Sequence, residues 1–349
     1  MGQESVSAAD GARALLIGSC EAFSGKSAVV LGLARLLLQQ GVAVRIGKPL
    51  ADSAEGGAAE PSAPLIDDDV RFVGGILGLA ESSLVPSVHL QGPQASHQRL
   101  LEGDLQAGAG LEALRGQLIA DAGGITLLEG AGSLSDGLLY GLSLAQLARG
   151  LQAPVVLVHA WSAAGSAEPL LAAKEQLGAL LAGVVLNGVP PDELEQVRAE
   201  VAPALERLGL PVLGVMPRSP LLRSVTVDEL ARRLDARVLC CRERLDLLVE
   251  TLSIGAMNVN SAMEFFRRRR NMAVVTGADR TDIQLAALEA STQCLILTGA
   301  GEPLPQLISR AEELDVPLLK VEHDTLTTVE VIESAFGHVR LHEAVKATY

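Results

Sequence analysis

The sequence predicts an α/β protein in which a doubly wound, mostly parallel sheet is followed by a second, smaller α/β domain. Hydrophobic residues make up 48% of the 349 residues and aromatic residues only 2%. A core of Leu, Val, Ile and Ala suits helices packed on a parallel sheet. Short apolar runs also alternate with amphipathic stretches along the chain, a pattern that indicates strands alternating with helices. At about 100 to 200 residues per domain, the length fits two domains.

Charge and hydropathy exclude several classes of protein. Lys and Arg number 28 and Asp and Glu 42, which gives a formal net charge of −14, so we expect no nucleic-acid partner. The longest apolar runs are far shorter than the roughly 18 to 20 residues of a membrane span, and the N-terminus lacks the pattern of a signal peptide. We therefore expect a cytoplasmic protein with no membrane partner. The four cysteines lack CxxC spacing, so neither a zinc ribbon nor a disulfide framework is expected.

The first domain is predicted to span residues 1–220. Residues 14–18 and 42–50 are predicted strands on either side of a helix that ends at Gly41, because the intervening apolar residues have the spacing of one helical face. Residues 51–64 have little apolar bulk and are predicted to form a loop. Further buried strands are expected at 125–132, 154–160, 182–189 and 211–217, with a helix at 192–209.

The second domain is predicted to span residues 221–349, after a linker at 218–226. The similar sequences AVVTGADR and LILTGAGE are expected to lie side by side in its sheet. We expect Arg267–Arg270 on a solvated helix face or in an inter-subunit row of salt bridges, not in a nucleic-acid site. His338 and His342 have the spacing of a metal pair on one helical face, but no neighbouring Cys or Asp supports it. The predicted strands are 271–278, 294–301 and 316–323, the predicted helices are 227–236, 282–291, 303–314 and 327–337, and 249–270 is expected to be irregular.

The strongest local signal for chemistry is the motif SGKS at Ser24–Ser27, which follows a buried strand and opens an amphipathic helix. Such a P-loop points backbone N–H groups at phosphate, places Lys26 on the terminal phosphates and offers the Ser27 hydroxyl to Mg²⁺. The alternative is an ordinary helix start with a surface lysine. A standard loop has its first glycine where this chain has Cys20. The other predicted phosphate-binding residues are Ser24, Gly25 and Ala28.

Three further residues belong to the predicted site. Glu129 ends a predicted strand, and the glycines that follow it, Gly130 first, allow a ligand to approach the backbone closely. A carboxylate at that edge holds Mg²⁺ directly or through water, although Glu129 is also suited to cap a helix. Lys48, at the end of the second strand, is placed to reach a transferring phosphoryl group or a carboxylate substrate. Glu21, inside the loop, either repels the phosphates or helps to hold the metal.

The first half of the chain contains, in this order, the motifs GSCEAFSGKSAVVLGLARLL, RIGKPL, DDDV, LLEGAG, VVLNGV and LGVMPRSPLL. They resemble the dethiobiotin-synthetase-like domain at the N-terminus of long phosphate acetyltransferases. The second half, with ETLSIGAMNVNSAMEFF and VTGADRTDIQLAAL, resembles the DRTGG domain that follows in those enzymes. Their catalytic domain, about 300 further residues, does not fit after Tyr349, so we expect that the chain is not an acetyltransferase by itself.

The resemblance implies ATP and Mg²⁺ as cofactors and gives roles to residues at matching positions. Asp67 or Asp69 would join Glu129 as carboxylates on the metal side, and Asn187 would lie near the nucleotide base. Dethiobiotin synthetases carry the loop GTDTxVGKT and have Ser or Thr plus Gly after KP-x-x, where this chain has EAF in the loop and LAD after KP. The diamino-acid substrate of those enzymes is therefore not expected. The remaining residues with implied roles are Lys26 and Ser27, at the phosphates and Mg²⁺, and Lys48, at phosphate or substrate.

The DRTGG signature appears as residues 279–283, Asp-Arg-Thr-Asp-Ile, without its two glycines. One interpretation is a turn that binds an anionic ligand through N–H groups and Arg280. The other is that Asp279 or Thr281 caps the following helix while Arg280 makes a structural ion pair. We favour the second, because the loss of glycine prevents close approach of a phosphate to the backbone.

We expect an ATP-binding regulatory protein that couples a nucleotide site to a DRTGG-like sensing or oligomerisation domain, with slow ATP hydrolysis or none. Its expected partners are the nucleotide, further copies of itself in a homo-oligomer, and another protein. The enzymatic alternative is an ATP-dependent ligase or phosphotransferase that activates a small carboxylate or carbamate, with Lys26 and Lys48 as catalytic residues. A third alternative is a non-enzymatic interaction module with a vestigial loop, whose stability neither ATP nor Mg²⁺ would alter.

Overall fold

The computed structural model of the chain contains two compact units. The first comprises Met1–Arg218 together with Leu341–Tyr349, and the second comprises Ser219–Arg340. The chain therefore returns to the first unit after Arg340, whereas the sequence prediction placed all of 221–349 in the second domain. The residues that the structure describes are 14–52, 65–103, 108–119, 124–163, 165–255, 259–267, 269–290, 292–339 and 341–347.

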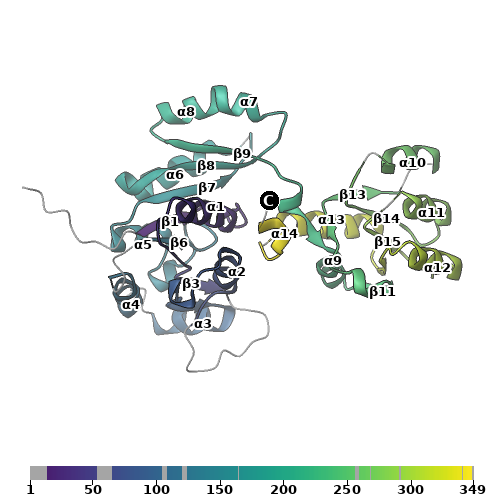
Figure 1. Ribbon diagram of the computed structural model, residues 1–349, viewed down its shortest axis with the longest axis horizontal. Helices are drawn as coiled ribbons and strands as arrows, with labels where there is room; N and C mark the ends of the chain where they lie inside the picture. The colour runs from purple at the N-terminus through teal and green to yellow at the C-terminus, as the bar shows by residue number, and fades with distance from the viewer. Residues whose placement is uncertain are drawn as a thin grey trace, which may run out of the picture. The chain divides into compact units, whose positions relative to one another are not determined.

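A seven-stranded sheet forms the centre of the first unit (Figure 1). Its strand order is β4-β2-β6-β1-β7-β8-β9, and every neighbouring pair is parallel. The doubly wound, mostly parallel sheet predicted from the sequence is therefore confirmed. The strands are β1 (Ala14–Gly18), β2 (Val44–Gly47), β4 (Leu84–Val85), β6 (Ile125–Glu129), β7 (Val155–Ala160), β8 (Leu181–Val189) and β9 (Val212–Pro217).

Two apolar layers, one on each face of this sheet, hold the first unit together. Leu16 and Leu128 lie in one layer and their chain neighbours Ile17 and Leu127 in the other, because successive side chains of a strand point to opposite faces. Strands buried on both faces need continuous apolar sequence, which explains the run at 155–158. None of the described helices of either unit is long and apolar enough to cross a membrane. The first layer is covered by α4 (Gly108–Ile119), α5 (Leu144–Leu151), α6 (Ala167–Leu177) and α8 (Ala202–Arg207), and the second by α1 (Lys26–Gln39) and α2 (Asp68–Leu77).

The helix predicted at 192–209 is interrupted. It consists of α7 (Leu194–Gln196), a π-helical turn at Val197–Val201, and α8. Pro203 lies in the first turn of α8 and has no N–H to continue the α-helical hydrogen bonds, so the turn before it widens.

A separate two-stranded parallel sheet pairs β3 (Leu50–Asp52) with β5 (His89–Gln91). It contains the first two residues of the loop predicted at 51–64, and the remaining residues of that loop, 53–64, lie outside the described part of the chain. Helix α3 (Pro93–Glu102) follows β5.

The second unit is built on a five-stranded sheet of order β11-β16-β15-β14-β13. Strands β13 to β16 are parallel, and β14 lies beside β15, as their similar sequences predict. Strand β11 pairs with β16 in the antiparallel direction and makes the sheet mixed. The sequence did not indicate β11, because a short, half-exposed edge strand lacks the apolar run of a central one. The elements are β11 (Arg237–Cys240), β13 (Thr251–Ile254), β14 (Met272–Gly277), β15 (Cys294–Thr298), β16 (Leu318–Lys320), α9 (Val227–Arg233), α10 (Val259–Arg267), α11 (Thr281–Glu289), α12 (Pro305–Glu313) and α13 (Thr325–Gly337).

The stretch 249–270, expected to be irregular, contains β13 and α10. Arg267 ends α10, and the side chains of Arg269 and Arg270 are exposed. Arg268 and the side chain of Arg267 lie outside the described residues. The expected solvated face or inter-subunit row of salt bridges therefore stays a prediction.

Residues 341–347 complete the apolar layer beneath α1 and α2. Ala347, in the short helix α14 (Ala344–Ala347), is 2% exposed and belongs to the same core cluster as the apolar faces of those helices. The guanidinium of Arg35 on α1 donates a hydrogen bond of 2.9 Å to the carbonyl oxygen of Ala347. This stretch is therefore part of the core of the first unit.

Candidate functional site

The loop of residues 19–25 connects β1 to α1. Gly25 has a φ of 95°, and a Cβ atom there would lie 2.2 Å from Nδ2 of Asn187, so both the backbone conformation and the space require glycine. Asn187 holds the loop by donating from Nδ2 to the carbonyl oxygen of Ser24 at 2.8 Å. Within the described residues, α1 has no side-chain cap and no acidic residue in its first turn. Its first amide groups are therefore suited to bind an anion.

Lys26 joins two loops of the predicted site. It is 6% exposed, and its Nζ donates to Oγ of Ser19 at 2.8 Å and to the carbonyl oxygen of Gly132 at 3.2 Å. Burial lowers the pKa of Lys26, while the charge of Glu129 opposes that shift. Gly132 belongs to the glycine loop after β6. The side chain expected on the terminal phosphates thus lies between the P-loop and the loop predicted to approach the ligand.

Ser27 and Glu129 lie together, as the sequence predicted for residues that hold one metal ion. The Ser27 hydroxyl donates to Oε1 of Glu129 at 3.1 Å. Burial raises the pKa of Glu129 to about 7, although the charges of Lys48 and Lys26 lower it. A hydroxyl and a carboxylate are oxygen ligands of the kind that Mg²⁺ prefers, and a bound cation would favour the ionised carboxylate. The donor set therefore fits Mg²⁺.

Lys48 forms a second buried cluster with two carboxylates. Its Nζ lies 3.1 Å from Oδ2 of Asp69 and 3.4 Å from Oδ2 of Asp67. Asp67 also caps α2, because its Oδ1 accepts the N–H of Asp69 at 2.9 Å. Asp68, between them, is exposed. The two carboxylates predicted on the metal side are thus held by the lysine predicted to contact phosphate or substrate.

Asp69 has another partner, which the sequence did not indicate. Nε2 of His342 lies 3.1 Å from Oδ1 of Asp69, and the imidazole ring packs against Phe72 on α2 with 5.9 Å between ring centroids. Burial would raise the pKa of Asp69, but the hydrogen bonds and charges of His342 and Lys48 hold it well below its usual range. A residue from the far end of the described chain therefore belongs to the candidate site.

The spacing of His338 and His342 does not produce a metal pair. Helix α13 ends at Gly337, so the two residues do not share a helical face. Nδ1 of His338 lies 2.6 Å from the carbonyl oxygen of Ser334, in the second unit, whereas His342 is in the first. A spacing of four residues places two side chains on one helical face only where the helix continues through both residues.

Gly130 permits close packing beside the P-loop. Its N–H donates to the carbonyl oxygen of Ile17 at 2.8 Å, and a Cβ atom at this position would lie 3.2 Å from Cδ1 of Leu144. Packing within the fold therefore explains why position 130 is a glycine. A contact of Gly130 with nucleotide, like the place of Asn187 near the base, stays a prediction.

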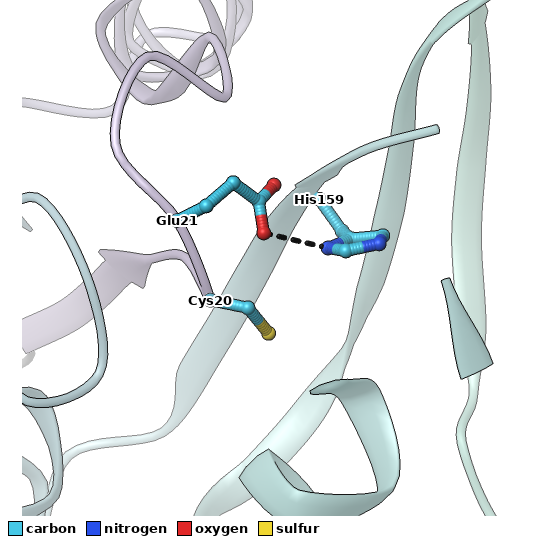
Figure 2. A group of neighbouring side chains, drawn as sticks. All are labelled: Cys20, Glu21 and His159. Carbon is cyan, nitrogen blue, oxygen red and sulfur yellow. Dashed lines mark hydrogen bonds and ion pairs between the residues drawn. The ribbon is translucent and has the colours of Figure 1, made fainter. Parts of the chain in front are cut away.

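Glu21 turns toward the end of β7. Its Oε1 accepts the N–H of Ala160 at 2.7 Å, and its Oε2 lies 3.0 Å from Nδ1 of His159. Figure 2 shows the contact between Glu21 and His159 as a dashed line. These hydrogen bonds fix the P-loop to the neighbouring strand. The sequence left the role of Glu21 open and gave no sign of His159.

In the second unit, the DRTGG signature forms the start of α11. Arg280 occupies the N-cap position, and within the described residues no side chain caps the helix. The prediction that Asp279 or Thr281 provides the cap is therefore wrong, because Thr281 is already the first helical residue. The predicted ion pair is present, with Nε of Arg280 3.3 Å from Oδ1 of Asp282.

Two family models match the chain. The first describes an AAA domain and matches residues 13–226, and the second describes a DRTGG domain and matches residues 229–335. A structure of a Cyanothece McdA variant in complex with ATP is similar at 17% identity and a TM-score of 0.36, over 59% of this chain and 84% of that one.

The curated relatives include phosphate acetyltransferases and dethiobiotin synthetases. Phosphate acetyltransferase of Nitratidesulfovibrio vulgaris is 27% identical over 93% of this chain and 47% of its own length, and that of Deinococcus radiodurans is 28% identical over 87% and 44%. The chain thus spans about half the length of these relatives. The ATP-dependent dethiobiotin synthetase BioD of Pseudomonas aeruginosa is 31% identical over 62% of this chain and 92% of its own length. The chain belongs to the AAA domain family in its dethiobiotin-synthetase-like form, and a DRTGG domain follows the AAA domain.

Proposed function

We propose that the chain binds ATP with Mg²⁺ in its first unit and acts as a regulatory protein whose DRTGG domain senses a ligand or mediates oligomerisation. The observation that carries this proposal is the start of α1, where Lys26 is buried across the loop and Ser27 is hydrogen-bonded to Glu129. The Pseudomonas aeruginosa relative is by name ATP-dependent, which supports ATP as the nucleotide.

Each residue of the loop has a distinct task in this proposal. The amide groups of Gly25–Ala28 hold phosphate oxygens, and the ammonium of Lys26 leaves Ser19 for the terminal phosphate. The Ser27 hydroxyl and the Glu129 carboxylate hold Mg²⁺, which supplies positive charge against the phosphates.

Regulation is proposed to act on Asp69. Residues 341–347 follow the second unit directly in the chain and pack in the first. His342 engages one oxygen of Asp69 while Lys48 engages the other. Loss of the His342 contact, which lies within the first unit, would release Oδ1 of Asp69 for the metal while Lys48 keeps Oδ2.

A second candidate function is that of an ATP-dependent ligase or phosphotransferase. It is favoured by the buried Lys48 cluster, which binding of phosphate alone does not require, and by the match to most of a dethiobiotin synthetase. Release of ADP that depends on an added small carboxylate or carbamate would distinguish this function from regulation.

The test of nucleotide binding is thermal unfolding of the full chain and of Lys26→Ala, with and without ATP and Mg²⁺. Ligand at about 100 times its dissociation constant adds roughly 2.7 kcal/mol to the free energy of unfolding. We expect that shift in the wild type and in the control Lys174→Ala, whose lysine binds the carbonyl oxygen of Leu208 on the first unit, and its loss in Lys26→Ala. Absence of a shift in the wild type would leave the non-enzymatic interaction module as the remaining function.

A further inference from the structure

We propose that Cys20, Glu21 and His159 form a binding site for a thiophilic divalent cation of the Zn²⁺ class, separate from the Mg²⁺ ligands Ser27 and Glu129. Each of the three offers one ligand atom, and these atoms all lie within 4.8 Å of one another. Figure 2 shows Cys20 and Glu21 on the loop after β1, with the Glu21 carboxylate directed at His159 on β7.

The fold brings these residues together through strand pairing. Strands β1 and β7 are parallel neighbours, with Gly18 beside Leu157, so their carboxyl ends lie at the same edge of the sheet. Cys20 and Glu21 follow β1, and His159 is the penultimate residue of β7. All three therefore depend on well-packed strands for their positions.

The three ligand atoms lie near the separations found in a metal site, and an ion would require small adjustments of their side chains. Zinc binds sulfur at about 2.3 Å and nitrogen or oxygen at about 2.0 to 2.2 Å, so ligand atoms on one tetrahedral ion stand about 3.3 to 3.8 Å apart. Oε2 of Glu21 and Nδ1 of His159 are 3.0 Å apart. Metal binding would move Oε2 and Nδ1 apart by a few tenths of an ångström and would draw the Cys20 sulfur away from the carbonyl oxygen of Pro169, to which the thiol donates at 3.5 Å.

The surroundings hold the carboxylate ligand in place. Oε1 of Glu21 is fixed by the N–H of Ala160, which leaves Oε2 directed at His159. Hydrogen bonds to a ligating carboxylate orient it in this way in many metal sites. The side chain of His159 is 5% exposed and that of Glu21 36%, so an ion reaches the site from the Glu21 side, and water completes its coordination.

Charge and ligand type both favour a soft divalent cation. In the metal-free site, the Cys20 thiol donates to the carbonyl oxygen of Pro169 at 3.5 Å. A bound dication displaces the thiol proton to solvent, and its two charges then balance one thiolate and one carboxylate. A set of sulfur, nitrogen and oxygen selects zinc-like ions over Mg²⁺, which prefers oxygen.

The experiment measures metal binding without nucleotide, so its outcome is independent of the proposed function. The full chain, stripped with EDTA under reducing conditions, is titrated with Zn²⁺ and, separately, Co²⁺. We expect one Zn²⁺ per chain, a sulfur-to-cobalt charge-transfer band in the near ultraviolet, and visible bands typical of tetrahedral Co²⁺.

Three variants test the assignment. Cys20→Ser should abolish the charge-transfer band, and Cys20→Ser and His159→Gln should each weaken Zn²⁺ binding by at least about 100-fold, since even outer-shell changes weaken metal sites 10- to 100-fold. His323→Gln, which removes an exposed histidine of the second unit, should bind like the wild type. Far-ultraviolet circular dichroism of each metal-free variant checks its fold. The proposal is overturned if the wild type binds no stoichiometric Zn²⁺, or if binding persists unchanged in the two ligand variants.

Discussion

The imidazole Nε2 of His342 lies 3.1 Å from Oδ1 of Asp69, on the carboxylate whose other oxygen contacts Lys48. The buried Asp69 therefore connects the end of the described chain with Lys48, which follows the carboxyl end of β2. Under the proposed function, a metal ion at Asp69 would have to share the carboxylate with these two partners or displace one of them.

Replacing His342 should strengthen nucleotide binding. In His342→Ala, Asp69 is released from one partner, and a contact of about 1 kcal/mol corresponds to a roughly fivefold gain in affinity. Titration of ATP in the presence of Mg²⁺, followed by thermal unfolding, measures this change. His338→Ala, in the second unit, is the matched control and should leave the affinity unchanged. Equal affinities for His342→Ala and the wild type would remove the regulatory role of the contact.

Asp69 should contribute to the pH dependence of stability in acid. Its pKa in the folded protein is held below the ordinary 3.8, so the folded state keeps this carboxylate ionised where the unfolded state protonates it. The resulting stability is complete above about pH 5 and is lost as the pH falls below 3.8 toward the folded-state value. Urea unfolding of Asp69→Asn and wild type at several acidic pH values tests this, and the stability difference between them should shrink as the pH falls. A difference independent of pH would show that the lowered pKa is absent.

Glu129 should lower the stability of the protein as the pH rises toward neutrality. Its pKa is raised from 4.5 to about 7, so between these values the folded state holds a proton that the unfolded state has released. The stability of the wild type should therefore fall as the pH rises through this range, and Glu129→Gln should remove most of that fall. Binding of Mg²⁺ should tighten over the same range, because the metal needs the ionised carboxylate. Parallel pH profiles of stability for Glu129→Gln and wild type would contradict the assignment.

Two glycines of the same region should respond differently to alanine. Gly25→Ala forces a side chain onto a left-handed backbone and against Asn187, and should lower the free energy of unfolding by more than about 1 kcal/mol and abolish nucleotide binding. A Cβ atom at Gly32, inside α1, would meet nothing within 4 Å apart from its chain neighbours and the backbone of its own helix. Gly32→Ala should stabilise the protein by about 0.5 to 1 kcal/mol. Denaturant unfolding of both variants measures the difference. Equal destabilisation of the two variants would show that the left-handed backbone at Gly25 is not the cause of the loss.

The sequence was sufficient to predict those parts of the fold that depend on local periodicity. Continuous apolar runs identified the central strands β1, β6, β7, β8, β14 and β15, because a strand covered on both faces has no polar side. The SGKS motif located the start of α1, and the separate glycine-rich motif at 127–137 located Glu129. Ser27 and Glu129 meet because both follow from the edge where parallel strands end.

The remaining features depend on contacts between distant parts of the chain. Nothing near His342 in the sequence indicates that it meets Asp69, and the four-residue spacing from His338 suggested a different partner. Likewise, His159 meets Glu21 only because β7 is placed beside β1. The edge strand β11 was missed because its residues are half exposed and carry no strong pattern.

The return of the chain at Leu341 makes the second unit an insertion, with both of its ends fastened to the first unit. A domain that is joined to its neighbour by a single connection can move without exerting force on that neighbour. The second unit is instead joined to the first by two connections, the segment after β9 and the segment before α14. The connection at Leu341 is followed directly by His342, whose contact with Asp69 lies within the first unit. Removing residues 341–347 would both uncover apolar surface beneath α1 and α2 and cut that connection.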